Sequence, residues 1–206
     1  MSKSTTPLRI GIFAGSFNPV HAGHVAFALQ VMQAADLDEV VFLPERRPRY
    51  KPSIEHYAHR VAMIKRAIRP HHQFSVLELV DRNFTVSRTL PQLQALFGGH
   101  QLVFMIGSDV VPNLPQWPYA KRMLQQVELA VGVRAGQNRA DIAKLVADWS
   151  IAPMDMVLVN SYAADISSAR IRHALRADHG AKGLLASVKQ YAQREWLYVS
   201  PGSTLS

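Results

Sequence analysis

The chain has 206 residues, and its hydrophobic fraction of 48% is enough to build one sizeable core. It contains no cysteine, which excludes disulfides, thiolate metal sites and a cysteine nucleophile. The net charge of +8 favours anionic partners, and because the basic residues are dispersed, we expect phosphorylated metabolites rather than nucleic acid.

Short apolar stretches rich in β-branched and aromatic residues alternate with stretches of helical periodicity. The predicted strands cover 8–14, 39–43, 74–79, 101–106, 128–133 and 156–159, and the predicted helices cover 22–35, 56–68, 86–97, 116–124, 138–148, 168–177 and 184–194. Nearly continuous apolar runs such as LVFMIG suit strands covered on both faces. The pattern predicts an α/β protein with a Rossmann-like, doubly wound parallel sheet.

We expect a single domain over residues 8–199 with a small C-terminal helical part, and disordered ends at 1–7 and 200–206. The sequence has no long apolar run and no signal-peptide pattern at its N-terminus. A cytoplasmic protein without a membrane partner is therefore expected.

The first predicted strand leads through a turn at Gly15–Pro19 into a helix that begins near Ala22. Helix N-termini combine unpaired N–H groups with the positive end of the dipole, so a phosphate fits there. His21 and His24 are three residues apart, which places both imidazoles on one side of the first helical turn. The segment predicts a phosphate site, and the structural alternative is a connection whose histidines only cap or pack.

A second helix start combines Ser167 and Ser168 with Arg170 and Arg172 in the first turn. Taken alone, this pattern is typical of a serine-capped amphipathic helix.

Both segments resemble motifs of the nucleotidylyltransferases. The first matches G-x-F-[DN]-P-x-H-x-G-H, and the second is similar to I-S-S-T-x-I-R, with Ala169 in place of the usual threonine. The resemblance implies that His21, His24 and Arg172 are catalytic residues that hold the phosphates of ATP. It also implies ATP-binding roles for Gly15, Ser16, Phe17 and Gly23 of the first motif and for Ser167 and Ser168 of the second.

The stretch Gly107-x-Asp109, followed by Leu114 and Trp117, is similar to the G-x-D…L-x-x-W segment of nicotinate or nicotinamide mononucleotide adenylyltransferases. By that resemblance Gly107 and Asp109 lie near the ATP ribose, and Trp117 stacks on the pyridine ring. An indole face attracts an electron-poor pyridinium. The ordinary alternatives are an N-capping aspartate and a core tryptophan.

The resemblance also assigns Asn18, Lys51 and Thr85 to the mononucleotide pocket, together with Trp117. Two departures concern that pocket. RPRYK stands where bacterial nicotinate enzymes commonly show P-P-H-K, and the segment 83–90 is one residue longer between its threonines than S-Y-T-x-x-T-L. The likeness extends to a closing pattern that includes Tyr191, Leu197 and Tyr198.

The predicted function is adenylyl transfer from ATP to nicotinate mononucleotide, with nicotinamide mononucleotide as the less favoured acceptor. The products are the dinucleotide of NAD biosynthesis and pyrophosphate. Mg²⁺ is expected as a cofactor that arrives with ATP, because the sequence shows no carboxylate cluster for a metal site of the protein itself. The alternatives are an adenylyltransferase for another acceptor, such as phosphopantetheine, and a nucleotide-binding regulator without turnover. The oligomeric state stays open, a homo-oligomer included.

Overall fold

The computed structural model describes residues 6–48, 54–134, 136–160, 166–177 and 179–199. The described residues do not include Lys51. They also do not include residues 1–5 and 200–206, which make up most of the two ends that were predicted to be disordered. The predicted limits of the domain therefore stay predictions.

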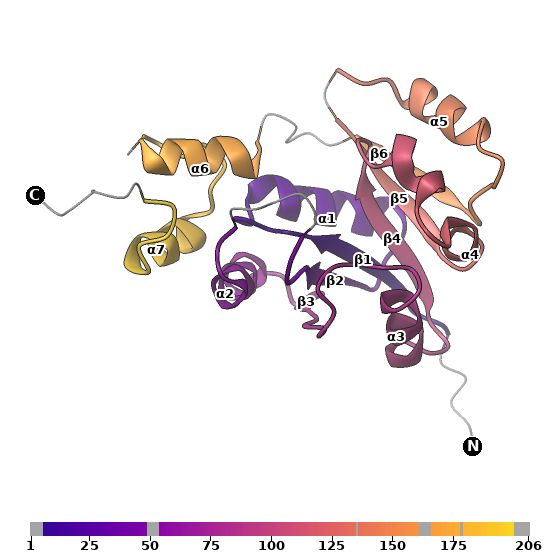
Figure 1. The fold of residues 1–206 in the computed structure, drawn as a ribbon, viewed down its shortest axis with the longest axis horizontal. Coiled ribbons are helices and arrows are strands. Elements are labelled where there is room, and N and C mark those ends of the chain that lie inside the picture. Colours follow the sequence, from indigo (N-terminus) through magenta and orange to yellow (C-terminus); the bar gives the residue numbers. More distant parts are fainter. Residues whose placement is uncertain (1–5, 49–53, 135, 161–165, 178, 200–206) are drawn as a thin grey trace, which may run out of the picture.

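Six parallel strands form one sheet (Figure 1). They are β1 (Arg9–Gly15), β2 (Glu39–Pro44), β3 (Phe74–Val76), β4 (Gln101–Gly107), β5 (Glu128–Val133) and β6 (Met156–Asn160). Their order is β3-β2-β1-β4-β5-β6, and every neighbouring pair is parallel. The predicted doubly wound α/β sheet is confirmed. Its strand order reverses between β1 and β4, where ligands bind in open α/β sheets.

The helices are α1 (Ala22–Ala34), α2 (Tyr57–Ile68), α3 (Thr89–Leu96), the 3₁₀ helix η1 (Val111–Gln116), α4 (Ala120–Leu124), α5 (Arg139–Ala147), α6 (Ser168–Arg176) and α7 (Ala186–Arg194). None of the helices in the described ranges is long and apolar enough to cross a lipid bilayer. The α6–α7 pair forms the predicted C-terminal helical part beside the sheet (Figure 1).

Alternation along the strands divides the core between the two faces of the sheet. In β1, Ile10 and Ile12 belong to one buried cluster and Phe13 to the other. The cluster around Phe13 includes side chains of α1, α2 and α7, whereas the cluster around Ile12 includes side chains of α3, α4 and α5. Because both faces are covered, each strand is apolar on both sides, as the sequence indicated.

Three predicted boundaries differ from the structure by three or more residues, and the other differences are of one or two residues. β3 ends at Val76 rather than at 79, because it is an edge strand that pairs only with β2. The third predicted helix begins at Thr89 rather than at 86, after a turn. The fourth begins at Ala120 rather than at 116, because Pro118 forces the preceding Trp117 into an extended conformation, with φ −66° and ψ 140°.

Candidate active site

A cavity of about 1260 Å³ opens at the carboxyl ends of the strands, around the point where the strand order reverses. Its walls come from the turns after β1, β2, β4 and β5 and from the starts of α1 and α6. Most pockets for a single small molecule measure roughly 300–1,000 Å³. This cavity therefore has room for two substrates side by side.

The turn after β1 forms one wall through Gly15, Ser16 and Phe17. Phe17 is buried and has φ +46°, a left-handed conformation that is rare for a non-glycine residue. A Cβ on Gly15 would come within 3.3 Å of the Phe17 ring, which explains the glycine at this position. Phe17 also packs edge-on against the imidazole of His24, with the ring centroids 5.1 Å apart.

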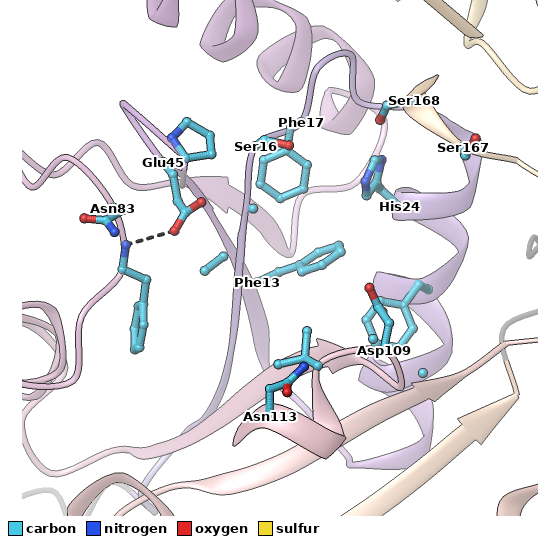
Figure 2. A pocket seen from close by; sticks show the side chains of 18 of the residues that line it. Phe13, Ser16, Phe17, His24, Glu45, Asn83, Asp109, Asn113, Ser167 and Ser168 are labelled. Atoms are coloured by element: carbon cyan, nitrogen blue, oxygen red, sulfur yellow. Dashed lines mark hydrogen bonds between the residues drawn. The ribbon is translucent and has the colours of Figure 1, made fainter. Parts of the chain in front are cut away.

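The two histidines of the motif stack on each other at the start of α1, with ring centroids 3.7 Å apart. The backbone N–H of His21 donates to Nδ1 of His24 at 3.2 Å, so a neutral His24 carries its proton on Nε2. His21 is only 6% exposed, and burial lowers its pKa to about 4. His21 is therefore neutral near pH 7, and His24 supplies an N–H donor to the same wall (Figure 2).

Helix α6 docks against the turn that precedes α1. Ser168 donates through its hydroxyl to the Pro19 carbonyl at 2.9 Å, and Arg172 donates through Nη1 to the Asn18 carbonyl at 2.8 Å. Ser167 caps the helix by accepting from the Arg170 N–H at 3.2 Å. The N-termini of α1 and α6 consequently meet at one end of the cavity, where Ser168 lies next to His24 (Figure 2). Two helix dipoles and a guanidinium make that end favourable for anions.

The cavity wall after β4 contains Gly107 and Asp109. A Cβ on Gly107 would lie 2.4 Å from a carboxylate oxygen of Asp109, so a larger residue there would displace the exposed Asp109 side chain from this position. Asp109 forms an exposed ion pair with Arg134, at 3.0 Å, which follows β5. Exposed pairs of this kind contribute little to stability, so the carboxylate can exchange its partner for a ligand at low cost.

The loop that carries Asn83 lies across the cavity from His24 and Ser168 (Figure 2), and aromatic rings line the cavity on the side of this loop. Trp117 and Phe84 both face it, with ring centroids 6.4 Å apart. The loop that carries Phe84 is fixed by Glu45, which accepts from the Phe84 N–H at 3.0 Å (Figure 2). Beside Phe84, the Thr85 hydroxyl is buried and has no hydrogen-bond partner within the described ranges. An aromatic wall with an unsatisfied hydroxyl suits a flat, polar ring.

The structure brings nearly all the predicted site residues to this one cavity, namely Gly15, Ser16, Phe17, His21, Gly23, His24, Thr85, Gly107, Asp109, Trp117, Ser167, Ser168 and Arg172. It does not place Asn18 on the cavity wall. The Asn18 side chain is 3% exposed and accepts from the Tyr198 hydroxyl and from the Glu55 N–H. The Asn18 amide oxygen therefore has two hydrogen-bond partners inside the protein, and the side chain is not placed to contact a mononucleotide in the cavity. Lys51 lies outside the described residues.

Several polar cavity residues escaped the sequence analysis, among them Glu45, Asn113 and Arg134. Glu45 and Arg134 directly follow β2 and β5. Their position after a strand of a parallel sheet was the available signal, because all such positions meet at one edge. Asn113 lies on η1, which sequence periodicity did not predict.

The described residues include no group of three or more histidine, aspartate and glutamate side chains that could hold a metal ion. The cavity offers instead hydroxyl, imidazole and guanidinium donors at the end where α1 and α6 begin. This donor set suits a metal that is coordinated mainly by substrate phosphates and water.

Comparisons with known proteins show the family to which this chain belongs. The family model of cytidylyltransferase-like proteins matches residues 12–174. Proteins from Dehalococcoides mccartyi and Bordetella parapertussis, each named a probable nicotinate-nucleotide adenylyltransferase, are 31% and 32% identical to this chain. The alignments cover 93% and 92% of this chain and 97% and 98% of those proteins. The chain belongs to the nicotinate-nucleotide adenylyltransferase family. The resemblance stated from the motifs is confirmed, and with it the class of enzyme, a nucleotidyltransferase.

The fold is shared with solved structures of the same family. The nicotinic acid mononucleotide adenylyltransferase of Plasmodium falciparum, solved in complex with NaAD, superimposes with a TM-score of 0.75 at 19% identity. The match covers 93% of this chain and 97% of that one. At this identity the comparison shows the Rossmann-like fold of the nicotinate-nucleotide adenylyltransferase family.

Proposed function

We propose that this protein transfers the adenylyl group of ATP to nicotinate mononucleotide, which yields nicotinate adenine dinucleotide and pyrophosphate. The observation that carries the proposal is the difference in chemistry between the two ends of the cavity. One end joins two helix N-termini, His24 and Arg172, whereas the other end is lined by Phe84 and Trp117. A triphosphate and a pyridine ring require these two environments within one cavity.

ATP occupies the end formed by the β1 turn, β4 and α6. His24, with Ser168 beside it, contacts the α- and β-phosphates, and Arg172 binds the β- and γ-phosphates that leave as pyrophosphate. Asp109 accepts from the ribose hydroxyls and releases Arg134 when it does so. His21 contributes no charge, since burial lowers its pKa to about 4, and it supports His24 by stacking.

Nicotinate mononucleotide occupies the aromatic end. Trp117 and Phe84 contact the pyridine ring, and the unpaired Thr85 hydroxyl donates to the nicotinate carboxylate. The prediction that Lys51 belongs to this pocket stands as a proposal. Its ammonium group would attract the same carboxylate or the 5′-phosphate.

The reaction is a direct displacement. An oxygen of the mononucleotide 5′-phosphate attacks the α-phosphorus of ATP and forms a new P–O bond, while the bond from the α-phosphorus to the bridging oxygen breaks and pyrophosphate leaves. Because the attacking phosphate oxygen is already ionised, no general base is needed. The protein contributes alignment of the two substrates and stabilisation of the developing charge.

Mg²⁺ fits this site as a cofactor that accompanies ATP. When bound, it supplies charge neutralisation between the phosphate oxygens. His24, Ser168 and Arg172 would hold the triphosphate with which the metal arrives.

The decisive experiment measures pyrophosphate release from ATP with a panel of acceptors: nicotinate mononucleotide, nicotinamide mononucleotide and phosphopantetheine. We expect kcat/KM to be highest for nicotinate mononucleotide, with the dinucleotide as the product. Faster turnover of phosphopantetheine would overturn the acceptor assignment. ATP binding without turnover of any acceptor would identify a regulator instead.

A further inference from the structure

The C-terminal end of the described chain is bonded to the first sequence motif. The Tyr198 hydroxyl donates to Oδ1 of Asn18 at 2.8 Å across 180 residues of sequence, and both side chains are buried, with exposures of 4% and 3%. Burial raises the pKa of Tyr198, so the phenol keeps the proton that it donates. The bond joins the segment after α7 to the turn between β1 and α1.

Asn18 is held from two sides and in turn supports α6. Its Oδ1 also accepts from the Glu55 N–H at 3.3 Å, and the Tyr198 N–H donates to the Glu55 carboxylate at 3.3 Å. The backbone carbonyl of Asn18 accepts from Arg172, and the next carbonyl, that of Pro19, accepts from Ser168. Two consecutive carbonyls therefore position the two α6 side chains that face the phosphate end of the cavity.

The backbone conformation around Tyr198 indicates that the hydrogen bond between Tyr198 and Asn18 is a defined feature of the fold rather than a chance contact. Trp196 and Tyr198 have φ values of +53° and +63°, in the left-handed region that non-glycine residues rarely adopt. Between them Leu197 is buried, whereas Trp196 is half exposed. Such conformations persist only where the surroundings determine them, and here they place the Tyr198 hydroxyl against Asn18.

We propose that Tyr198 is a positioning residue for the adenylyl transfer: through its hydroxyl it fixes Asn18, and through the Asn18 and Pro19 carbonyls it fixes Arg172 and Ser168 for the triphosphate. The inference rests on the proposed function, since it assumes that α6 binds ATP. Tyr198 does not itself line the cavity. Loss of its hydroxyl leaves the buried amide oxygen with one partner among the described residues, the longer bond from the Glu55 N–H, so the turn and α6 can shift together.

The test compares Tyr198→Phe with Tyr191→Phe. Tyr191 is a matched control because it is also buried, at 8% exposure, and its hydroxyl bonds to Nδ1 of His59 at 2.9 Å, away from the cavity. Each variant loses one hydroxyl from the same buried cluster. Both should therefore lose a few degrees in Tm, which thermal denaturation measures and which also confirms that the variants are folded.

Only Tyr198→Phe should alter the triphosphate site. We expect its Kd for a methylene-bridged ATP analogue with Mg²⁺ to rise about tenfold and its kcat/KM for ATP to fall by a similar factor. The KM for nicotinate mononucleotide should change by less than about twofold, and Tyr191→Phe should leave all three constants within about twofold of the parent. This split between the two substrates is what a merely structural role would not produce.

Analogue affinity of Tyr198→Phe within about twofold of the parent would overturn the inference, as would an equal loss in Tyr191→Phe. The binding measurement needs no acceptor. If the parent protein binds the analogue but does not turn over nicotinate mononucleotide, the proposed function fails and the inference about Tyr198 is still decided by the two affinities. Failure of the parent to bind the analogue would overturn both.

Discussion

His21 shows how burial selects the chemistry of one residue. It is 6% exposed, stacks on His24, and its Nδ1 has no hydrogen-bond partner in the part of the chain that the structure describes. A charged imidazole in that place would be poorly solvated, which is why its pKa falls to about 4. His21 therefore shapes the wall, and the positive character of the site comes from Arg172 and the helix ends.

This burial makes folding stability depend on pH. The unfolded chain binds a proton at His21 below its ordinary pKa of about 6.5, whereas the folded protein does so only near pH 4. Between these values the unfolded state holds more protons, so stability is full above pH 7 and falls as the pH drops. We expect His21 to account for a loss of roughly 2 kcal/mol in the free energy of unfolding between pH 7 and pH 5, measured by urea denaturation.

His21→Gln is the control for this dependence, because glutamine keeps polar atoms of similar size and does not titrate. The variant should lose clearly less stability than the parent over the same pH interval. Parallel stability curves for the two proteins would show that His21 is not the titrating group.

The direction of the Asn18 side chain could not be predicted from residue types alone. The sequence predicted thirteen residues that do line the cavity, because motif spacing and helix starts fix which backbone positions meet at the strand ends. The same motif placed Asn18 in the mononucleotide pocket, whereas its side chain turns inward to Tyr198. That partner comes from a segment 180 positions later, so no local pattern indicates the direction of the Asn18 side chain.

At the scale of elements, helix α2 is tied to the cavity by one buried arginine. The Arg60 guanidinium is 0% exposed and donates to the carbonyls of Glu55 at 3.0 Å, Ser16 at 2.6 Å and Arg46 at 3.0 Å. Burial lowers its pKa, yet an arginine keeps its proton at any physiological pH. Arg60 thus joins the turn after β1 to the segment after β2.

Replacing Arg60 by Met should destabilise the fold strongly. The methionine fills most of the volume but leaves the Ser16 and Arg46 carbonyls without their donor, so we expect the free energy of unfolding to fall by about 3 kcal/mol. Chemical denaturation measures the change. Arg66→Met on the same helix is the control, since among the described residues the Arg66 guanidinium donates to the Ala62 carbonyl of its own helix, at 2.9 Å, and lies over the Tyr191 ring, at 4.0 Å, but bonds to no loop carbonyl.

We expect the Arg66 variant to lose less than about 1 kcal/mol. Comparable losses in the two variants would mean that the three carbonyl contacts of Arg60 add nothing beyond ordinary helix packing.

Element types were predictable from periodicity, whereas some boundaries depended on tertiary context. The six strands and the long helices follow from apolar spacing, because burial on two faces of a sheet or one face of a helix imposes that spacing. The late start of α4 follows from Pro118. This proline is visible in the sequence, but the prediction of a helix over 116–124 relied on the apolar periodicity instead. The early end of β3 follows from its place at the sheet edge, which no local pattern encodes.

At the scale of the whole molecule, the site depends on both ends of the chain. The order β3-β2-β1-β4-β5-β6 puts the ends of β1 and β4 at the centre of the sheet, and the C-terminal α6 returns to the start of α1. The Ala22 N–H at the first turn of α1 donates to the Gly183 carbonyl at 2.9 Å, which adds a further link between the C-terminal part and the first motif. The triphosphate, in the proposed function, bridges the same two parts.

Binding of an ATP analogue should therefore slow amide exchange in two segments that are far apart in sequence. We expect increased hydrogen-exchange protection in the first turns of both α1 and α6, because the ligand joins their N-termini, whereas α5 should not change since none of its residues lines the cavity. At a free concentration of about 100 times Kd, the ligand stabilises the bound state by about 2.7 kcal/mol, which is ample for detection. Mass spectrometry of peptic peptides resolves the three helices. Protection at α1 without protection at α6 would show that the C-terminal part does not take part in binding the triphosphate. A uniform change that includes α5 would indicate global stabilisation rather than a ligand that contacts these two helix N-termini.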